Sequence, residues 1–163
     1  MAKSEASSIF KSSGPGDTAR LAGLFARALT GGETLLLEGP IGSGKTFFTR
    51  ELARALGARS LPVSASFNLM RSYGGRLKLY HFDLFRAAEA DLENIGLEDY
   101  LGRADGVTVV EWAGAAAGLT AGFPRLLLEF SLAGGDRRVI KARCPDRSAL
   151  AAFLKVKEEW EKN

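Results

Sequence analysis

Residues 39–46 read Gly39-Pro40-Ile41-Gly42-Ser43-Gly44-Lys45-Thr46. This segment fits the phosphate-binding loop pattern Gly-x-x-x-x-Gly-Lys-Thr at every required position. Its glycines let the backbone curl so that successive N–H groups point at one anion. Lys45 can reach the β- and γ-phosphates of a nucleotide, and the Thr46 hydroxyl can ligate Mg²⁺. We therefore expect all eight residues to bind a nucleotide.

The segments on both sides of this loop support the same interpretation. Residues 35–37 are three leucines, as expected of a buried strand. Residues 47–56 place apolar and charged side chains at helical spacing, and the amino end of a helix favours an anion. A glycine-rich turn with an incidental Lys-Thr pair is the alternative, and the flanking strand and helix argue against it.

The remaining pattern predicts an α/β fold of the P-loop NTPase type, with three layers and a central sheet that mixes parallel and antiparallel strands. We find no repeat and no internal boundary, so residues 1–163 are expected to form one domain. Residues 1–16 are rich in Ser and Gly and predict a poorly ordered start with a short strand at 8–11. Helices are expected at 19–29, 47–56, 87–95 and from Asp146 to the C-terminus. Strands are expected at 35–37, 61–63, 67–73, 77–82, 107–110, 125–132 and 137–143.

Composition favours a soluble cytoplasmic protein. The chain is 46% hydrophobic and 25% charged, which is ordinary for a globular domain. No apolar run approaches the ~20 residues of a membrane span, and the N-terminus lacks the apolar core of a secretory signal. Cys144 is the only cysteine, so we expect a reducing compartment. A monomer is the default expectation.

The net charge of +3 lies entirely in residues 120–163, because residues 1–119 sum to zero. The basic side chains concerned are Arg137, Arg138, Lys141, Arg143 and Arg147. Such a cluster can contact nucleic acid or an acidic partner. The excess is small and no aromatic residues interleave it, so a solvated strand and helix face is the favoured interpretation.

Two acidic residues follow apolar runs that resemble strands. Asp83 comes after residues 77–82, and Glu111 comes after residues 107–110. Because Mg²⁺ takes one or two carboxylates together with phosphates and waters, both are candidate metal ligands. Glu111 follows the more strand-like run. The alternative for each is a carboxylate that is simply solvated.

Three further positions carry weaker signals. His81 is the only histidine, and hard cations prefer oxygen, so we expect it to make structural hydrogen bonds. Ser64 and Ser66 lie downstream of the loop, where segments that sense a γ-phosphate often occur. Trp112 is expected to pack in the core.

Missing motifs narrow the class of enzyme. The chain has no Asn-Lys-x-Asp sequence of the kind that guanine-specific GTPases use. Its arginines are too scattered to mark the lid of a small nucleotide kinase, and no second glycine-rich signature suggests a transporter-type ATPase.

Taken in order, these residues resemble the bacterial TsaE family (also called YjeE), the ATPase of tRNA threonylcarbamoyladenosine synthesis. The resemblance is strong over residues 17–113, and its most specific elements are His-x-Asp-Leu-x-Arg at 81–86 and Val-Glu-Trp at 110–112. The other matching segments are 37–48, 63–67, Tyr73 and 96–100. The chain departs from the family at Ala65 and Ser66, where Pro and Thr are usual, at Phe85, where Tyr is common, and at Ala113, where Pro is usual.

The resemblance implies a factor that binds ATP with Mg²⁺ and hydrolyses it slowly when alone. It implies that ATP turnover resets the TsaB–TsaD complex, which transfers threonylcarbamoyl to adenosine in tRNAs that read codons starting with A. The tRNA would be contacted indirectly, through that complex. Lys45 would neutralise phosphate charge, and Thr46, Asp83 and Glu111 would hold Mg²⁺. Glu111 would also orient water, Ser66 keeps a hydroxyl for the γ-phosphate or metal, and Thr18 is a candidate edge for adenine.

Two other functions stay open on the sequence. The first is a small P-loop kinase of a metabolite, although the acidic residues between Glu89 and Glu98 would repel an anionic substrate. The second is a nucleotide-dependent binding module, which would bind ATP tightly without turnover.

Overall fold

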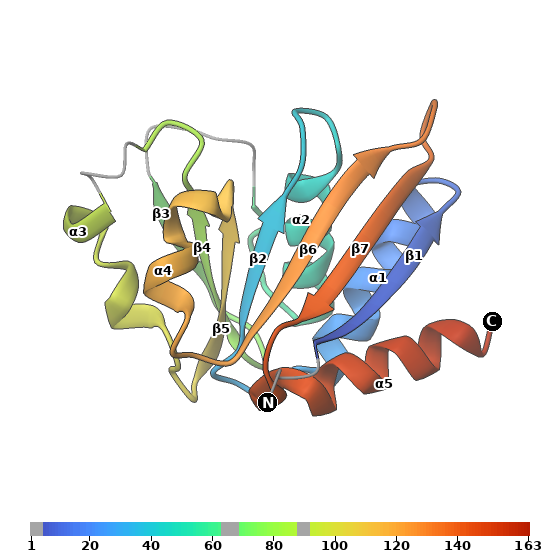
Figure 1. Cartoon of the computed structure of the whole chain (residues 1–163). Coiled ribbons are helices and arrows are strands. Elements are labelled where there is room, and N and C mark those ends of the chain that lie inside the picture. The colour runs from blue at the N-terminus through green and yellow to red at the C-terminus, as the bar shows by residue number, and fades with distance from the viewer. Residues whose placement is uncertain (1–4, 63–68, 88–91) are drawn as a thin grey trace.

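The computed structural model describes residues 5–62, 69–87 and 92–163. Within them, one sheet runs in the order β1-β7-β6-β2-β5-β4-β3 (Figure 1). Its strands are β1 (Ala6–Ser12), β2 (Thr34–Glu38), β3 (Met70–Tyr73), β4 (Lys78–Asp83), β5 (Gly106–Glu111), β6 (Arg125–Leu132) and β7 (Arg138–Cys144). The helices are α1 (Pro15–Ala28), α2 (Lys45–Ala55), α3 (Leu92–Ile95), α4 (Ala117–Thr120) and α5 (Leu150–Glu161). The 3-10 turns are η2 (Leu97–Tyr100), η3 (Ala113–Ala116) and η4 (Arg147–Ala149).

The centre of the sheet is parallel and its margins are antiparallel. Strand β2 pairs in parallel with β5 and β6, and β5 pairs in parallel with β4. Strand β7 pairs antiparallel with both β1 and β6, and β3 pairs antiparallel with β4. The mixed sheet of the expected P-loop NTPase fold is confirmed. Because parallel strands end at the same edge, the carboxyl ends of β2, β4 and β5 lie together, with Glu111 in register with Leu37 and Asp83.

Helices cover both faces of the parallel strands, which explains why β2 and β5 read as continuous apolar runs. On one face, α1, α2 and α5 bury a cluster that includes the edge-to-face rings of Phe25, Phe48 and Phe130. On the other face, α3, η2 and η3 pack on Leu36, Phe82 and Val110 (Figure 1). The three expected layers are therefore present.

The expectation of a poorly ordered start is wrong for the residues from Ala6 onward. Strand β1 pairs with β7 over all seven of its residues and is longer than the predicted 8–11. Phe10 is 1% exposed and packs edge-to-face on Trp160. Helix α1 begins at Pro15, earlier than predicted, because proline is preset for the first helical position. The serine-rich sequence did not indicate the full strand, which pairing with β7 and the buried ring of Phe10 stabilise.

Other boundaries shifted as well. Residues 61–62 are not in a strand, and Val63 lies outside the described residues. The strand predicted at 67–73 begins at Met70, and only Leu92–Ile95 of the helix predicted at 87–95 is described as helical. The final helix is preceded by η4, where Asp146 accepts a hydrogen bond from the Ser148 N–H.

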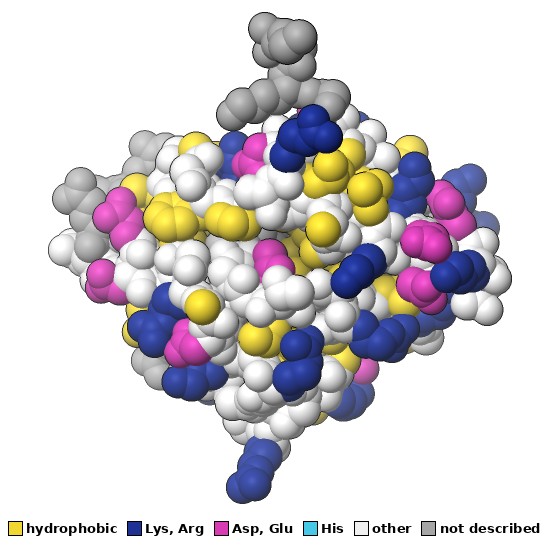
Figure 2. Space-filling view, turned by 90° about the horizontal axis from the view of Figure 1, so that it is seen from below, with side chains coloured by type: hydrophobic (Ala, Val, Ile, Leu, Met, Phe, Trp, Pro, Cys, Tyr) yellow, Lys and Arg dark blue, Asp and Glu magenta, His cyan; other side chains and the backbone are white. Residues whose placement is uncertain are grey.

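Charged side chains are dispersed over the edge of the sheet opposite the phosphate loop. Figure 2, which views the molecule from below, shows Lys and Arg spread singly with Asp and Glu among them. Arg103 and Lys78 both pair with Asp105, and Arg143 pairs with Glu129. In the described parts of the chain, no helix combines the length and apolar character that crossing a membrane requires.

Candidate functional site

The phosphate loop connects the end of β2 to the start of α2, as predicted. Gly39, Gly42 and Gly44 all have positive φ, at 148°, 77° and 102°. A Cβ added at Gly42 or Gly44 would meet nothing within 4 Å, whereas one at Gly39 would lie 2.6 Å from the Phe130 carbonyl oxygen. Glycine at 39 thus permits close packing, and glycines at 42 and 44 permit the left-handed backbone of the loop. This open cradle at a helix N-terminus fits a phosphate group.

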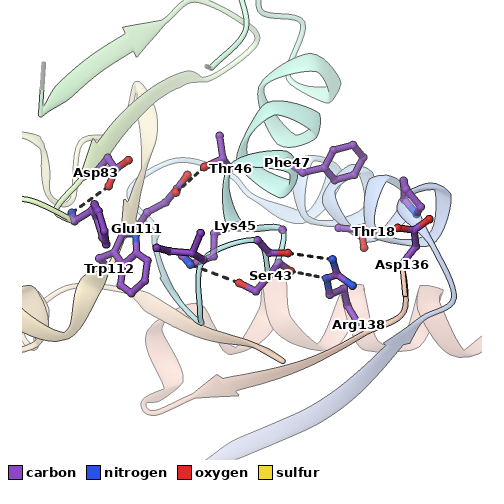
Figure 3. A pocket seen from close by; sticks show the side chains of 15 residues that line it. Thr18, Ser43, Lys45, Thr46, Phe47, Asp83, Glu111, Trp112, Asp136 and Arg138 are labelled. Atoms are coloured by element: carbon purple, nitrogen blue, oxygen red, sulfur yellow. Dashed lines mark hydrogen bonds between the residues drawn. The ribbon is translucent and has the colours of Figure 1, made fainter. Parts of the chain in front are cut away.

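A cavity of about 520 Å³ opens beside the loop. Its lining residues come from both ends of the chain: Pro15, Thr18, Ile41, Gly42, Ser43, Gly44, Lys45, Thr46, Phe47, Asp83, Phe85, Glu111, Trp112, Asp136 and Arg138. Asp83, Glu111 and Trp112 lie at one end, and Thr18, Phe47 and Asp136 lie at the other (Figure 3). The volume is in the range of small-molecule and cofactor pockets.

Lys45 folds back onto its own loop. Its Nζ donates to the carbonyl oxygens of Gly39 (2.5 Å) and Pro40 (3.1 Å) and lies 4.1 Å from the centre of the Trp112 ring. Burial lowers the pKa of Lys45, and the carboxylates of Glu111, Glu38 and Asp83 oppose that shift. Lys45 Nζ also lies 3.5 Å from the Ser43 hydroxyl, so each of its hydrogen-bond acceptors is neutral. An ammonium group in such surroundings gains from an anionic partner, as a nucleotide phosphate would be.

Glu111 ends β5 and is 1% exposed. Its Oε2 accepts a hydrogen bond from the Thr46 hydroxyl at 3.0 Å. Its Oε1 lies 2.9 Å from His81 Nε2 and 3.1 Å from the Thr49 hydroxyl. His81 thus makes the structural hydrogen bond that we expected. Sequence reasoning missed Thr49, and the only signal was its spacing of three residues from Thr46, which puts both on one face of α2.

Asp83 ends β4 beside Glu111, and its Oδ1 accepts a hydrogen bond from the Phe85 N–H (3.1 Å). Hydroxyl and carboxylate oxygens from Thr46, Asp83 and Glu111 are the hard ligands that Mg²⁺ prefers. Within residues 5–62, 69–87 and 92–163, no group of three His, Cys, Asp or Glu side chains could hold a metal ion. Mg²⁺ usually takes only one or two carboxylates and completes its shell with phosphate and water, so these three side chains would suit it when a nucleotide is bound.

The far end of the cavity holds Thr18, the candidate edge for adenine, together with Asp136 and Arg138, for which the sequence suggested no role at this site. Thr18 lines it, but its buried hydroxyl is already paired with the Ser12 hydroxyl at 2.8 Å. Arg138, expected on a solvated face, donates instead to the loop carbonyls of Ser43 (3.1 Å) and Gly42 (3.0 Å). Asp136 lies at the turn between β6 and β7 (Figure 3). The predicted Ser66 lies outside the described residues.

Trp112 is half-buried against the core cluster of Leu36, Phe82 and Val110 and also lines the cavity, so the prediction that it packs in the core is confirmed in part. It has φ 57°, the one positive φ outside glycine among the residues that the structure describes. Its ring packs against Phe85, with centroids 4.9 Å apart. A non-glycine residue in this conformation is a sign of a functional constraint.

Comparisons with known proteins agree on one family. The family model described as "Threonylcarbamoyl adenosine biosynthesis protein TsaE" matches residues 12–140. A Bacillus subtilis tRNA threonylcarbamoyladenosine biosynthesis protein TsaE is 40% identical over 100 residues, which are 61% of this chain and 62% of that relative. The protein of the same name from Treponema pallidum is 35% identical over 127 residues, which are 77% of this chain and 93% of that relative. The match therefore spans less than two thirds of the Bacillus relative and most of the Treponema one.

A solved structure matches the whole fold. The crystal structure of Bacillus subtilis YdiB superposes with a TM-score of 0.76 at 28% sequence identity. The superposition covers 96% of this chain and 97% of the other.

Proposed function

The chain belongs to the TsaE family, and on that basis we propose that it is a Mg²⁺-dependent ATPase acting in the synthesis of threonylcarbamoyladenosine in tRNA. The observation that carries this proposal is the contact between Thr46 and Glu111 at 3.0 Å. It joins the phosphate loop to a strand-end carboxylate, and nucleoside-triphosphate hydrolysis needs both.

Each residue has a role that follows from its position. The loop residues 39–46 cradle the phosphates, and Lys45 neutralises their charge. Thr46, Asp83 and Glu111 hold Mg²⁺, which would offset the negative charge on the β- and γ-phosphates. Glu111 also orients the attacking water. The nucleoside extends from the loop toward Thr18, Phe47 and Asp136, because the metal-binding oxygens lie at the opposite end of the cavity.

The chain hydrolyses ATP slowly by itself and works with the TsaB–TsaD complex in the cytoplasm. ATP turnover resets that complex between rounds of transfer to tRNAs reading codons that start with A, and the complex makes the tRNA contacts. Ile41 is 73% exposed and Phe85 is 47% exposed, and both line the cavity. Exposed apolar side chains at a cavity support the expectation that a partner covers it. The chain is a monomer when alone.

The experiment is to measure ATP hydrolysis by the purified chain, alone and with TsaB–TsaD from the same source. Stimulation by the complex that disappears in Lys45→Ala is the expected result. Unchanged slow turnover and no complex formation would discard the partner and favour a small-molecule kinase. Tight ATP binding without turnover, even with partners, would favour a nucleotide-dependent binding module.

A further inference from the structure

We propose that His81 and Thr49 are positioning residues that anchor one oxygen of Glu111 and leave its other oxygen for the metal and water. This inference rests on the proposed ATPase function, because Glu111 then acts on Mg²⁺ or its water. The two residues come from different elements, β4 and α2, and converge on the same atom, Oε1.

The hydrogen bonds are divided between the two oxygens. Oε1 lies 2.9 Å from His81 Nε2 and 3.1 Å from Thr49 Oγ1. An ionised carboxylate only accepts hydrogen bonds, so His81 must carry its hydrogen on Nε2. The single hydroxyl hydrogen of Thr49 is also within reach of the Lys45 carbonyl oxygen, at 2.9 Å. His81 is therefore the main anchor, and Thr49 shares its hydrogen between two acceptors.

Oε2 has a different environment. The Thr46 hydroxyl donates to it at 3.0 Å. Each carboxylate oxygen offers about two acceptor sites, so Oε2 keeps one for a metal ion or a metal-bound water. Since Thr46 is itself a proposed Mg²⁺ ligand, Oε2 lies next to one of the atoms that would hold the ion.

Burial makes the anchoring necessary. His81, Thr49 and Glu111 are 6%, 0% and 1% exposed, so water cannot replace a lost donor easily. The last torsion of a glutamate side chain is broad and roughly two-fold, so nothing within Glu111 fixes the orientation of its carboxylate. Residues that orient metal ligands in this way typically matter about 10–100-fold for metal affinity or activity.

The test compares matched pairs of variants. His81→Leu removes the donor, whereas His81→Gln places an amide nitrogen near the position of Nε2. Thr49→Val removes the hydroxyl, and Thr49→Ser keeps it. Thr120→Val is the control, because Thr120 is equally buried but does not line the cavity. Its hydroxyl donates to the carbonyl oxygens of Ala116 and Ala117 and accepts a hydrogen bond from Arg125 Nη1 at 3.4 Å. The dissociation constant of ADP is measured by calorimetry with Mg²⁺ and with EDTA, together with thermal unfolding.

We call the ratio of the dissociation constants of ADP in EDTA and in Mg²⁺ the Mg²⁺ gain. In EDTA, the dissociation constant of His81→Leu should lie within about twofold of that of the original chain. Its Mg²⁺ gain should be roughly 10-fold smaller. Thr49→Val loses less, because its hydrogen is shared. His81→Gln and Thr49→Ser should keep the Mg²⁺ gain of the original chain, and Thr120→Val should leave it unchanged. If His81→Leu does not fold, the Thr49 pair decides.

An unchanged Mg²⁺ gain in His81→Leu and Thr49→Val would overturn the inference, as would an equal loss in Thr120→Val. Equal losses in His81→Leu and His81→Gln would also overturn it, because the ring would then only fill space. Failure of the proposed function looks different: the original chain would bind no ADP in either buffer, and the inference would fall with it.

Discussion

Glu111 is the residue on which hydrolysis depends in this account. We expect Glu111→Gln to bind ATP in EDTA nearly as tightly as the original chain and to lose roughly 10-fold of the tightening that Mg²⁺ gives, because an amide is a poorer ligand than a carboxylate. Turnover should fall further, by about 10²–10⁴-fold, because an amide cannot accept a proton from the attacking water. Calorimetry of nucleotide binding and steady-state hydrolysis give the two numbers. Glu129→Gln is a suitable control, since Glu129 pairs with Arg143 away from the cavity. Equal loss of binding and turnover in Glu111→Gln would make Glu111 structural or a metal ligand only.

The sequence predicted those functional residues that a pattern of neighbouring residues marks. Lys45 and Thr46 follow from the loop spacing, and Asp83 and Glu111 follow from their places at strand ends. Thr49 and Arg138 could not be predicted, because their roles depend on partners 62 and 95 residues away. The place of Trp112 could be predicted only in part, because an aromatic residue after a buried strand can pack on the core and also form a cavity wall, as this ring does.

Two glycines of the phosphate loop, Gly42 and Gly39, should differ in how much the stability of the fold depends on them. An alanine in the left-handed region costs about 1–2 kcal/mol, so Gly42→Ala should lower the free energy of unfolding modestly. It should also weaken nucleotide binding, because the positive φ of Gly42, which helps to turn the N–H groups of the loop toward one anion, is strained in alanine. Gly39→Ala should lose more stability, because its Cβ would also meet the Phe130 carbonyl oxygen at 2.6 Å. Urea unfolding and ADP binding measure the two effects, and the reverse order of stabilities would contradict this picture.

Strand β1 gives a second prediction for an element. Phe10→Ala removes a fully buried ring and should reduce the free energy of unfolding by about 3–5 kcal/mol. Ile9, its neighbour on the same strand, is 59% exposed, and Ile9→Ala should change that free energy by less than about 0.5 kcal/mol. Urea titrations of both variants provide the comparison. Similar small losses would mean that β1 contributes little to the fold.

Helices α1 and α2 could be predicted from sequence because their apolar faces repeat at helical spacing. Only residues 8–11 of strand β1 could be predicted, because the rest of the strand depends on pairing with β7, more than 100 residues away. The start of α1 at Pro15 was missed because proline usually ends a helix or strand, although it is also favoured at the first position of a helix.

For the whole molecule, the strand order is what assembles the site. Strands β4 and β5 are separated in the chain by α3 and η2, yet their ends place Asp83 beside Glu111 and both beside the loop after β2. The sequence predicted the class of fold, but not that β6 would lie next to β2 or that the β6–β7 turn would reach the cavity. Those placements depend on long-range pairing, which no local pattern specifies.

The proposal that ATP turnover by this chain resets the complex that modifies tRNA can be tested by counting products. TsaB–TsaD, tRNA and a threonylcarbamoyl donor are incubated with this chain and ATP, and the threonylcarbamoyladenosine formed per TsaD is counted. We expect many rounds with the original chain, and a single round with Lys45→Ala or without the chain. Many rounds in all three reactions, or a single round in all three, would show that turnover by this chain does not reset the complex.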